Sequence, residues 1–364
     1  MARSAVTRDA ASPMLLTSVL RNPALAAELD TRAWERLVWQ SRAAELMGQL
    51  QRALTSAGSL AHAPDGARRH LDGAWFISGK HADAVRHELH GLQEILQPLE
   101  VPVILLKGAA YCAQHNRASV GRIFNDIDIL VPKSALPAVE ERLTWAGWFP
   151  THTNAYDERY YREWMHEIPP LEHKNRATAL DVHFTILPPT SGIRPDPDDF
   201  FAAAVSLPGE WSFFKVLCPQ DMVIHSSCHL FFGEFHKGLR DLLDLHILLT
   251  DMAADSQFWA QLLERADYLG LGQPVVDALQ QSRRIYGTAI PDAVLGKLQT
   301  RITTRWPRSS RAWLFEHALR PNHASAYGLT TSLAHWLIFT RSHWLRMPFS
   351  LLVYHIFHKL FSDK

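Results

Sequence analysis

The stretch "VILLKGAAY" at residues 103–111, followed by "GRIFNDIDILV" at residues 121–131, decides the fold. Each contains an apolar run of the length and composition typical of a buried strand. A lysine and a glycine, Lys107 and Gly108, directly follow the first run, and two aspartates lie at alternate positions in the second. Because buried charges need a partner or a ligand, these two predicted strands are where we expect a functional site.

A third predicted strand lies in "TALDVHFTIL" at residues 178–187. Its apolar residues alternate with small or polar ones, which is the period of a strand with two different faces. Asp181 and His183 fall on the second face, which we expect to be functional or solvated. His183 either borders the site or only packs beside it.

The two aspartates of the second run, Asp126 and Asp128, share one face of their strand because side chains at i and i+2 point the same way. Adjacent carboxylates repel each other unless water or a divalent cation separates their charges. Mg²⁺ suits such a pair, because it prefers oxygen ligands and completes its shell with water and phosphates. If Asp181 lies on a neighbouring strand, the three acids form a set typical of metal-dependent phosphoryl transfer.

Lys107 and Gly108 supply the features expected of a phosphate site. A glycine at a strand-to-helix turn lets the backbone approach phosphate oxygens, and the helix predicted at 109–117 would add free N–H groups. Lys107 can neutralise a triphosphate. Arg122 is expected either to contact phosphate or to pair with Asp126. The sequence therefore predicts a nucleotide–metal site.

The rest of the chain predicts an α+β protein in four parts. Residues 1–100 form a helical region, 101–190 the core with a small mixed sheet, 191–330 a helical domain that closes the cleft, and 331–364 an amphipathic, aromatic-rich tail. Within these parts we expect a loop at 55–70, a helix at 134–148 closed by a glycine, and helices at 219–232 and 238–249, from apolar periodicity and from proline and glycine positions.

Composition limits the function classes. The 37 basic and 37 acidic residues balance, so an extended nucleic-acid surface is not expected. The three cysteines form no C-x-x-C motif, which disfavours a disulfide framework or a zinc ribbon. With no apolar signal segment near the first residues, we expect a cytoplasmic protein.

The tail raises a membrane question, because "SLAHWLIFTRSHWLRMPFSLLVYHIFHKLF" at residues 332–361 is rich in apolar and aromatic residues. Arg341 and Arg346 interrupt it, which leaves apolar runs well short of the ~20 residues that span a bilayer. We favour a helical pair that completes the core. The alternative is an interfacial helix that makes a peripheral membrane or protein contact through 331–364.

Taken together, "LLKGAAY", "DIDILV" and "LDVHF" resemble the uncharacterised nucleotidyltransferase family of the polymerase-β-like superfamily, which includes kanamycin nucleotidyltransferase and the minimal nucleotidyltransferases. The resemblance covers about residues 80–250 and implies that superfamily's core. It places Gly108 at the glycine turn, Asp126 and Asp128 as the metal pair, and Asp181 as the third acid. Arg122 and His183 match two further positions that this family usually fills the same way. In the C-terminal helices four more residues match, namely His225, His229, Arg240 and Asp244.

One departure concerns the glycine motif. The superfamily usually has Gly-Ser or Gly-Gly, whereas this chain has Lys107-Gly108-Ala109-Ala110. Without a hydroxyl to hold the terminal phosphate, Lys107 and backbone N–H groups would have to replace it. The donor, and nucleotidyl transfer itself, therefore stay open at this point.

Several residues are candidates for the cleft. His229 and His225, at i and i+4 on one helix face, are expected to be core or acceptor-pocket residues rather than zinc ligands. Arg240 and Asp244 have the spacing of an ion pair on one helix, and this pairing is the expected role of Arg240 unless the helix lines the cleft. His173 is expected in a loop at the cleft mouth. The predicted cleft set is His183, His173, His229 and Arg240.

The predicted activity is Mg²⁺- or Mn²⁺-dependent transfer of a nucleoside monophosphate from an NTP, with ATP the expected donor, to a hydroxyl. The acceptor is a small molecule, a sugar, a peptide natural product or a protein. One alternative is transfer of a glycosyl or other group from a nucleotide-activated donor. Another is a non-catalytic nucleotide-binding or antitoxin-like partner protein.

Overall fold

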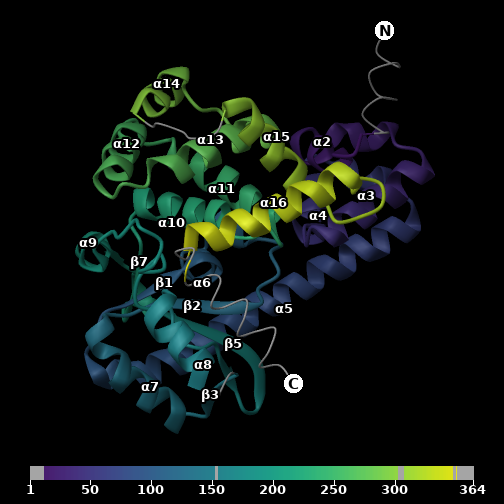
Figure 1. Ribbon diagram of the computed structural model, residues 1–364. Helices are drawn as coiled ribbons and strands as arrows, with labels where there is room; N and C mark the ends of the chain where they lie inside the picture. The colour runs from purple at the N-terminus through teal and green to yellow at the C-terminus, as the bar shows by residue number, and fades with distance from the viewer. Residues whose placement is uncertain (1–11, 152–154, 302–306, 347–349, 351–364) are drawn as a thin grey trace.

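The computed structural model describes residues 12–151, 155–301, 307–346 and 350. One mixed sheet lies at the lower left of Figure 1, with the C-terminal helices above it and the N-terminal helices to the right. The long helix α5 (Asp65–Leu96) runs from the N-terminal helices to the sheet. The α+β class predicted from the sequence is confirmed in this coarse sense.

The sheet has seven strands in the order β3-β4-β5-β2-β1-β7-β6. Their bounds are β1 Val103–Leu106, β2 Asp126–Leu130, β3 Trp148–Pro150, β4 Leu171–His173, β5 Arg176–His183, β6 Val205–Ser206 and β7 Phe214–Val216. Strand β2 runs antiparallel to β1 and parallel to β5, while β7 runs parallel to β1. The sheet therefore extends past residue 190, where the sequence pattern ended the core.

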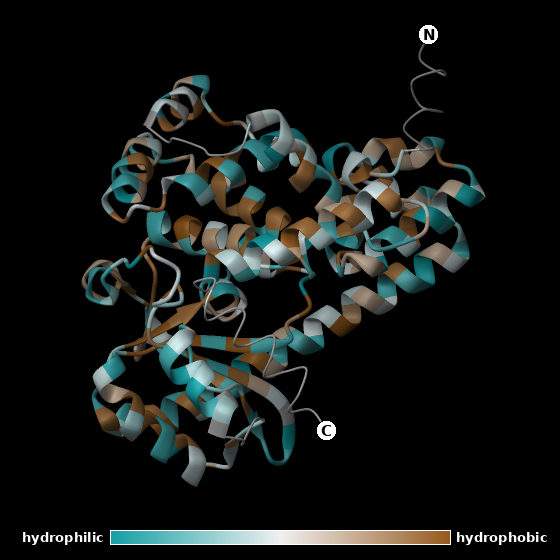
Figure 2. Ribbon diagram, in the orientation of Figure 1, coloured by the Kyte–Doolittle hydropathy of each residue, from teal (hydrophilic) through white to brown (hydrophobic). Residues whose placement is uncertain are grey.

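The central strands are apolar because both of their faces are covered. All four residues of β1 are at most 1% exposed, and Ile127, Ile129 and Leu130 of β2 are equally buried. Figure 2 shows the apolar residues gathered in these strands and in the inner C-terminal helices. This shared core fixes β2 and β5, and with them the aspartates they carry.

The N-terminal helices are α2 (Leu15–Arg21), α3 (Thr31–Ala43), α4 (Met47–Ser56) and α5. The loop predicted at 55–70 is shorter than expected, because α5 begins at Asp65. An acidic residue in the first turn favours a helix start, and the burial of Ala67 and Leu71 holds that turn against the core.

Four shorter helices flank the sheet: α6 (Lys107–Ala113), α7 (Leu136–Trp145), α8 (Ala155–Arg159) and α9 (Pro197–Ala203). Helix α7 ends as predicted beside Gly147, whose φ of +96° is the left-handed conformation that glycine adopts readily. Helix α6 is shorter and earlier than the predicted 109–117, and a 3₁₀ turn at Arg117–Ser119 follows it.

The C-terminal helices are α10 (Pro219–Phe232), α11 (Gly238–Met252), α12 (Phe258–Tyr268), α13 (Gly272–Tyr286), α14 (Asp292–Arg301), α15 (Arg308–Ala318) and α16 (Leu329–Arg346). Helix α10 has the bounds predicted from the sequence. It is buried on nearly every side, because it packs against α11, α12 and α13.

Helix α16, yellow in Figure 1, runs along the C-terminal helices and ends above the sheet. One face packs on α15 and α10, as the favoured core prediction for this part of the tail required. The opposite face exposes apolar side chains, namely Leu329, Leu333, Trp336, Phe339 and Trp344. Within the described ranges no helix is long and apolar enough to cross a bilayer. Residues 347–349 and 351–364 of the predicted tail lie outside the described residues, and the membrane or protein contact stays a prediction.

Candidate active site

Three acidic residues come together at neighbouring strands. Asp126 opens β2 and Asp128 follows two residues later, so both share a face. In the parallel register of β2 and β5, Asp128 pairs with Asp181. The structure thus makes the Asp181 strand a direct neighbour of the aspartate pair, as the sequence analysis required. Asp126 is exposed, whereas Asp128 is only 2% exposed.

Lys107 lies against these acids because it directly follows β1, whose last residue pairs with Asp128. Its Nζ donates to Oδ1 of Asp128 at 2.6 Å. Its backbone has a φ of +44°, a left-handed conformation that is costly for a residue with a side chain. Strain of this kind clusters at functional sites. Here the lysine contacts a carboxylate, where the sequence analysis expected a phosphate.

His183 contacts Asp128 from the other side. Its Nε2 lies 3.1 Å from Oδ1 of Asp128, and its Nδ1 lies 3.4 Å from Oε2 of Glu167. The ring is 1% exposed. The polar face of β5 is therefore not solvated at this end. Of the two predicted alternatives, that His183 borders the site or only packs beside it, the contact with Asp128 favours the first.

Sequence reasoning missed Glu167 and its neighbour His166. Glu167 forms an isolated antiparallel bridge with His183, and the backbone N–H of Ile168 donates to the carbonyl of Val182 at 3.0 Å. A single bridge has no alternating pattern of its own, so no sequence period points to it. The available sequence signal was the pair of ligand-type residues His166 and Glu167, which lies ten or more residues before the strand predicted at 178–187.

Negative charge dominates this cluster. Burial raises the pKa of Asp181 to about 8, together with the nearby charges of Glu167 and Asp128. The charge of Asp128, with burial, raises the pKa of Asp126. Burial also opposes ionisation of Asp128, yet Lys107 and His183 hold its pKa well below the usual range. Asp128 is therefore the ionised centre of a crowded group of carboxylates.

Gly108 and Arg122 pack closely against each other beside the acids. A Cβ at Gly108 would lie 2.5 Å from Nη1 of Arg122 and 2.9 Å from the ring of Phe124. The glycine is thus needed for the close packing of an arginine. Nε of Arg122 donates to Oδ2 of Asp244 at 3.0 Å, so its carboxylate partner is Asp244 rather than Asp126, and the phosphate contact stays a prediction.

Arg240 and His229 reach the site from α11 and α10. Both line a cavity of about 50 Å³ between the C-terminal helices and the sheet, together with Lys107, Tyr111, Arg122, Asp126, Asp128, Ser226, Asp241 and Asp244. Arg240 forms ion pairs with Glu45 and Asp241, each at 2.9 Å. The expected Arg240–Asp244 pair is not the one formed, because Asp244 pairs with Arg122. His229 and Arg240, both predicted to lie in the cleft, nevertheless line the same cavity as Asp126 and Asp128.

A second small cavity, of about 40 Å³, adjoins the first. It shares Lys107 and His229 with the first cavity, and it is also lined by His166, His225 and Arg346 at the end of α16. His225 is 4% exposed. In the part of the chain that the structure describes, His225 and His229 do not join a cluster of metal-ligand type. This agrees with the preferred prediction of core or pocket histidines.

His173 is not at the cleft mouth and not in a loop. It lies in β4, is 8% exposed, and packs edge-on against Trp148. It pairs with Arg176, at the opposite end of β5 from Asp181. Five residues of strand separate Arg176 from Asp181, which is roughly 16 Å. The prediction of a cleft role for His173 was wrong because a short strand continues through "LEH".

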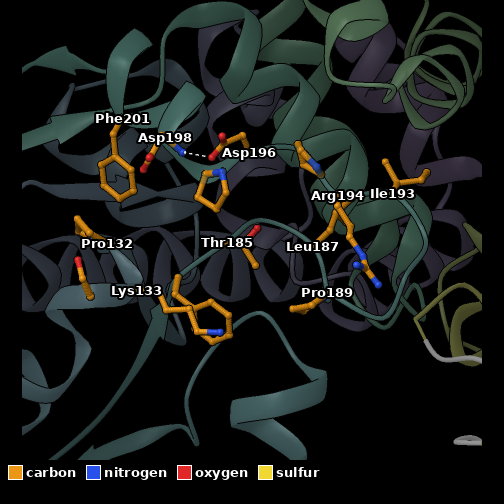
Figure 3. A pocket seen from close by; sticks show the side chains of 14 residues that line it. Pro132, Lys133, Thr185, Leu187, Pro189, Ile193, Arg194, Asp196, Asp198 and Phe201 are labelled. Carbon is orange, nitrogen blue, oxygen red and sulfur yellow. Dashed lines mark hydrogen bonds between the residues drawn. The ribbon is translucent and has the colours of Figure 1, made fainter.

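A larger pocket of about 450 Å³ lies beside these cavities (Figure 3). Leu187 lines both this pocket and the cavity next to Lys107. The ammonium of Lys133 lies 4.9 Å from the centre of the Phe184 ring, and Asp196 caps helix α9 through the backbone N–H of Asp198. The volume of this pocket is typical of a small-molecule site. None of the residues predicted from the sequence lines it.

A comparison with known protein families identifies the family of this chain. A family described as uncharacterised nucleotidyltransferase matches residues 30–287, from the N-cap of α3 to the C-cap of α13. The chain belongs to this family. The match is wider than the region of about 80–250 that the sequence motifs covered, and it includes the acids, Lys107 and the helices above them. No curated protein matches the chain.

Proposed function

We propose that this protein is a metal-dependent nucleotidyltransferase with a polymerase-β-like core. It would transfer a nucleoside monophosphate from an NTP to an acceptor hydroxyl, with pyrophosphate as the leaving group. The register of β2 and β5 carries the proposal, because it sets Asp128 beside Asp181 with Asp126 on the same face of β2. The three cysteines have no disulfide partner, which suits a reducing cytoplasm.

The residues present fit a Mg²⁺ or Mn²⁺ ion by their donor chemistry. Among the described residues, neither Asp126, Asp181 nor Oδ2 of Asp128 accepts a hydrogen bond, so oxygen ligands stand free in a cluster with surplus negative charge. Mg²⁺ in proteins is usually held by one or two carboxylates together with substrate phosphates. Asp126 and Asp128 would hold it here. Bound there, the ion would neutralise phosphate charge and make a coordinated hydroxyl more acidic.

Asp181 would act on the acceptor. It lies on the β5 side of Asp128, is largely buried, and has no hydrogen-bond donor among the described residues. A carboxylate in this position can accept the proton or hydrogen bond of an incoming hydroxyl and orient its oxygen. Transfer chemistry depends mainly on such positioning and on stabilised charge.

Lys107 would move from the carboxylate of Asp128 to a phosphate of the bound nucleotide. In the described arrangement it donates to Oδ1 of Asp128, and its flexible side chain can turn from that oxygen to a phosphate when a metal ion neutralises the acids. An ammonium at the turn would replace the hydroxyl that the family's usual glycine motif supplies. The expected donor is ATP.

The cavities at the acids are small. Cavities of about 50 and 40 Å³ hold only one or two water molecules each, whereas ligand sites usually measure about 300–1,000 Å³. Leu345 and Arg346 at the end of α16 cover the second cavity. An NTP bound at the acids would therefore extend beyond these cavities, for which the neighbouring pocket of about 450 Å³, which shares Leu187 with the second cavity, offers space.

The Lys107–Asp128 bond favours one alternative. A lysine that permanently neutralises the acid would suit a non-catalytic nucleotide-binding protein. The two functions differ in the effect of Lys107→Met. In the enzyme this change weakens nucleotide binding and leaves Mg²⁺ essential. In the binding protein it removes only the counter-charge of Asp128.

Radioactive label transfer tests the proposed activity. The protein is incubated with Mg²⁺, with an extract of the cells that make it as the acceptor source, and with ATP labelled at either the α- or the γ-phosphorus. We expect a product labelled only from α-labelled ATP. It should be absent with EDTA and at least about 100-fold weaker with Asp126→Asn.

The control for this experiment is Asp83→Asn, which changes an exposed aspartate of α5 whose ion-pair partners among the described residues are Lys80 and Arg86. It should behave as the wild type does. Label from the γ-phosphorus, an acceptor that gains a hexose mass without a base, or full activity in Asp126→Asn would overturn the proposal.

A further inference from the structure

A second group of metal-ligand side chains adjoins the aspartates through the His183–Asp128 hydrogen bond. It consists of His166, Glu167 and His183, whose candidate ligand atoms all lie within 4.8 Å of one another. Within the described residues this is the one such group, and Asp126, Asp128 and Asp181 are not part of it. It is distinct from the site proposed for Mg²⁺.

Backbone pairing builds this group. Glu167 is bridged to His183, and the N–H of Phe184 donates to the carbonyl of His166 at 3.0 Å. These bonds bind residues 166–168 to the end of β5, where the side chains of directly opposed residues project to the same side. The rings of His166 and His183 lie with their centres 5.1 Å apart.

The hydrogen bond to Asp128 fixes the state of the His183 ring. Oδ1 of Asp128 also accepts from Lys107, so it is an acceptor, and Nε2 of His183 must carry the hydrogen. In the neutral ring Nδ1 then carries a lone pair. That lone pair faces Oε2 of Glu167 at 3.4 Å, and Nδ1 has no hydrogen-bond partner although it is buried. Two lone pairs repel at this separation unless a cation or a proton lies between them, and a proton can fill this place too, since burial lowers the pKa of His183 but the charges of Glu167 and Asp128 raise it above its usual value.

The position of His166 favours a metal ion over a shared proton between His183 and Glu167. A proton shared by His183 and Glu167 needs no third residue. Nδ1 of His166 is also buried without a hydrogen-bond partner, and its Nε2 lies 3.9 Å from the same Oε2 of Glu167. A metal-binding histidine usually donates its other ring N–H to a carboxylate, which is the relation between His183 and Asp128.

We propose that His166, Glu167 and His183 bind a divalent ion of borderline softness, such as Zn²⁺. Two imidazoles and one carboxylate are a common zinc set, whereas Mg²⁺ prefers oxygen ligands alone. The ion would hold the His183 ring in place and, through Nε2, the orientation of Asp128. His183 is then a positioning residue for the aspartate site, and the protein carries two metal sites of different ligand chemistry.

Zinc binding in the presence of excess Mg²⁺ tests this proposal directly. The full-length protein is stripped with a chelator, dialysed against Zn²⁺ with Mg²⁺ in large excess, and its metal content is measured by plasma mass spectrometry. We expect one Zn²⁺ per chain. Glu167→Gln and His166→Gln should each weaken binding by at least about 10- to 100-fold.

Two controls locate the zinc. His90→Gln removes a histidine from an exposed His–Glu pair, at 3.7 Å from Glu210, that has no third ligand, and it should bind Zn²⁺ as the wild type does. Asp126→Asn should also keep its zinc while losing Mg²⁺-dependent nucleotide binding. This separates failure of the zinc proposal from failure of the proposed activity.

A second measurement does not depend on whether the ligand variants fold. Zn²⁺ that binds only the folded state raises the melting temperature of the wild type, and equally that of His90→Gln. Replacement by Co²⁺ should give a visible absorption band that Glu167→Gln lacks. No zinc in the wild type, equal zinc in Glu167→Gln, or loss of zinc in Asp126→Asn would each overturn the proposal.

Discussion

Two buried ion pairs in this protein differ in how their charges balance. In the C-terminal helices, Arg265 of α12 donates to both oxygens of Asp221 of α10, at 2.7 and 2.8 Å, and Asp221 is 0% exposed. At the strands, Lys107 donates to a single oxygen of Asp128, beside Asp126, Asp181 and Glu167. The first pair is neutral and complete, whereas the second leaves a surplus of carboxylates.

This difference separates a structural pair from a functional one. A neutral, two-point pair needs nothing further, so it holds α10 and α12 together. A cluster with surplus negative charge is costly unless a cation joins it, and such clusters are where metal ions and phosphates bind. The changes below test whether the two pairs respond as this distinction requires.

The largest loss of stability is expected from Asp221→Ala. This change leaves the Arg265 guanidinium partly buried without its partner, and breaking such a pair costs roughly 3 kcal/mol in the free energy of unfolding. Urea unfolding followed by circular dichroism measures it. Nucleotide binding should be unchanged in the folded variant. A loss below about 0.5 kcal/mol would mean that the pair is not structural.

Gly108→Ala should come next, because its new Cβ meets the guanidinium of Arg122 and the ring of Phe124. Overpacking of this kind costs about 2 kcal/mol. Gly79→Ala is the matched control, since a Cβ there meets nothing within 4 Å on the long helix α5. The control should gain up to about 1 kcal/mol of stability. Equal effects of the two changes would contradict the packing role of Gly108.

Asp181→Asn should have the opposite sign to Asp221→Ala. Burial, together with the charges of Glu167 and Asp128, raises the pKa of Asp181 to about 8, so near neutral pH the metal-free protein folds at the cost of protonating this carboxylate; a neutral Asn removes that cost and stabilises it, by about 1 kcal/mol. Thermal unfolding in EDTA measures the gain. The same variant should keep Mg²⁺-dependent nucleotide binding but lose transfer to the acceptor. Destabilisation in EDTA would show that Asp181 has a structural partner.

The smallest effect is expected at an exposed pair, Arg283–Asp292. Its side chains are 44% and 86% exposed, so water screens their attraction even though the atoms lie 2.6 Å apart. Arg283→Ala should change the free energy of unfolding by about 0.5 kcal/mol or less. A change as large as that of Asp221→Ala would mean that burial does not set the strength of these pairs.

The sequence predicted the strands that carry the site because their patterns are local. The apolar run of β1, the alternating aspartates of β2 and the period of β5 are all visible within ten residues. Helix α10 was predictable for the same reason. Strands β3, β4, β6 and β7 have only two or three residues each, which is too short for a period to appear.

The partners of the charged residues were less predictable, because they depend on contacts between distant parts of the chain. Arg122 pairs with Asp244, 122 positions away, and Arg240 with Glu45, 195 positions away. The bond between Lys107 and Asp128 depends on the register of β1 against β2, which sets Leu106 opposite Asp128. Spacing along one helix suggested Arg240–Asp244, but burial of Arg122 beside Gly108 gave Asp244 a different partner.

The most direct test of the three-carboxylate site is nucleotide binding measured by calorimetry. The ligand is an ATP analogue with a methylene group between the α- and β-phosphorus atoms, and each titration is run with Mg²⁺ and with EDTA. We expect the wild type and Asp83→Asn to bind only with Mg²⁺, and Asp126→Asn and Asp128→Asn, which remove the proposed metal ligands, to bind at least about 100-fold more weakly. Binding that is equally tight in EDTA, or unchanged in both aspartate variants, would contradict a metal–nucleotide site at these strands.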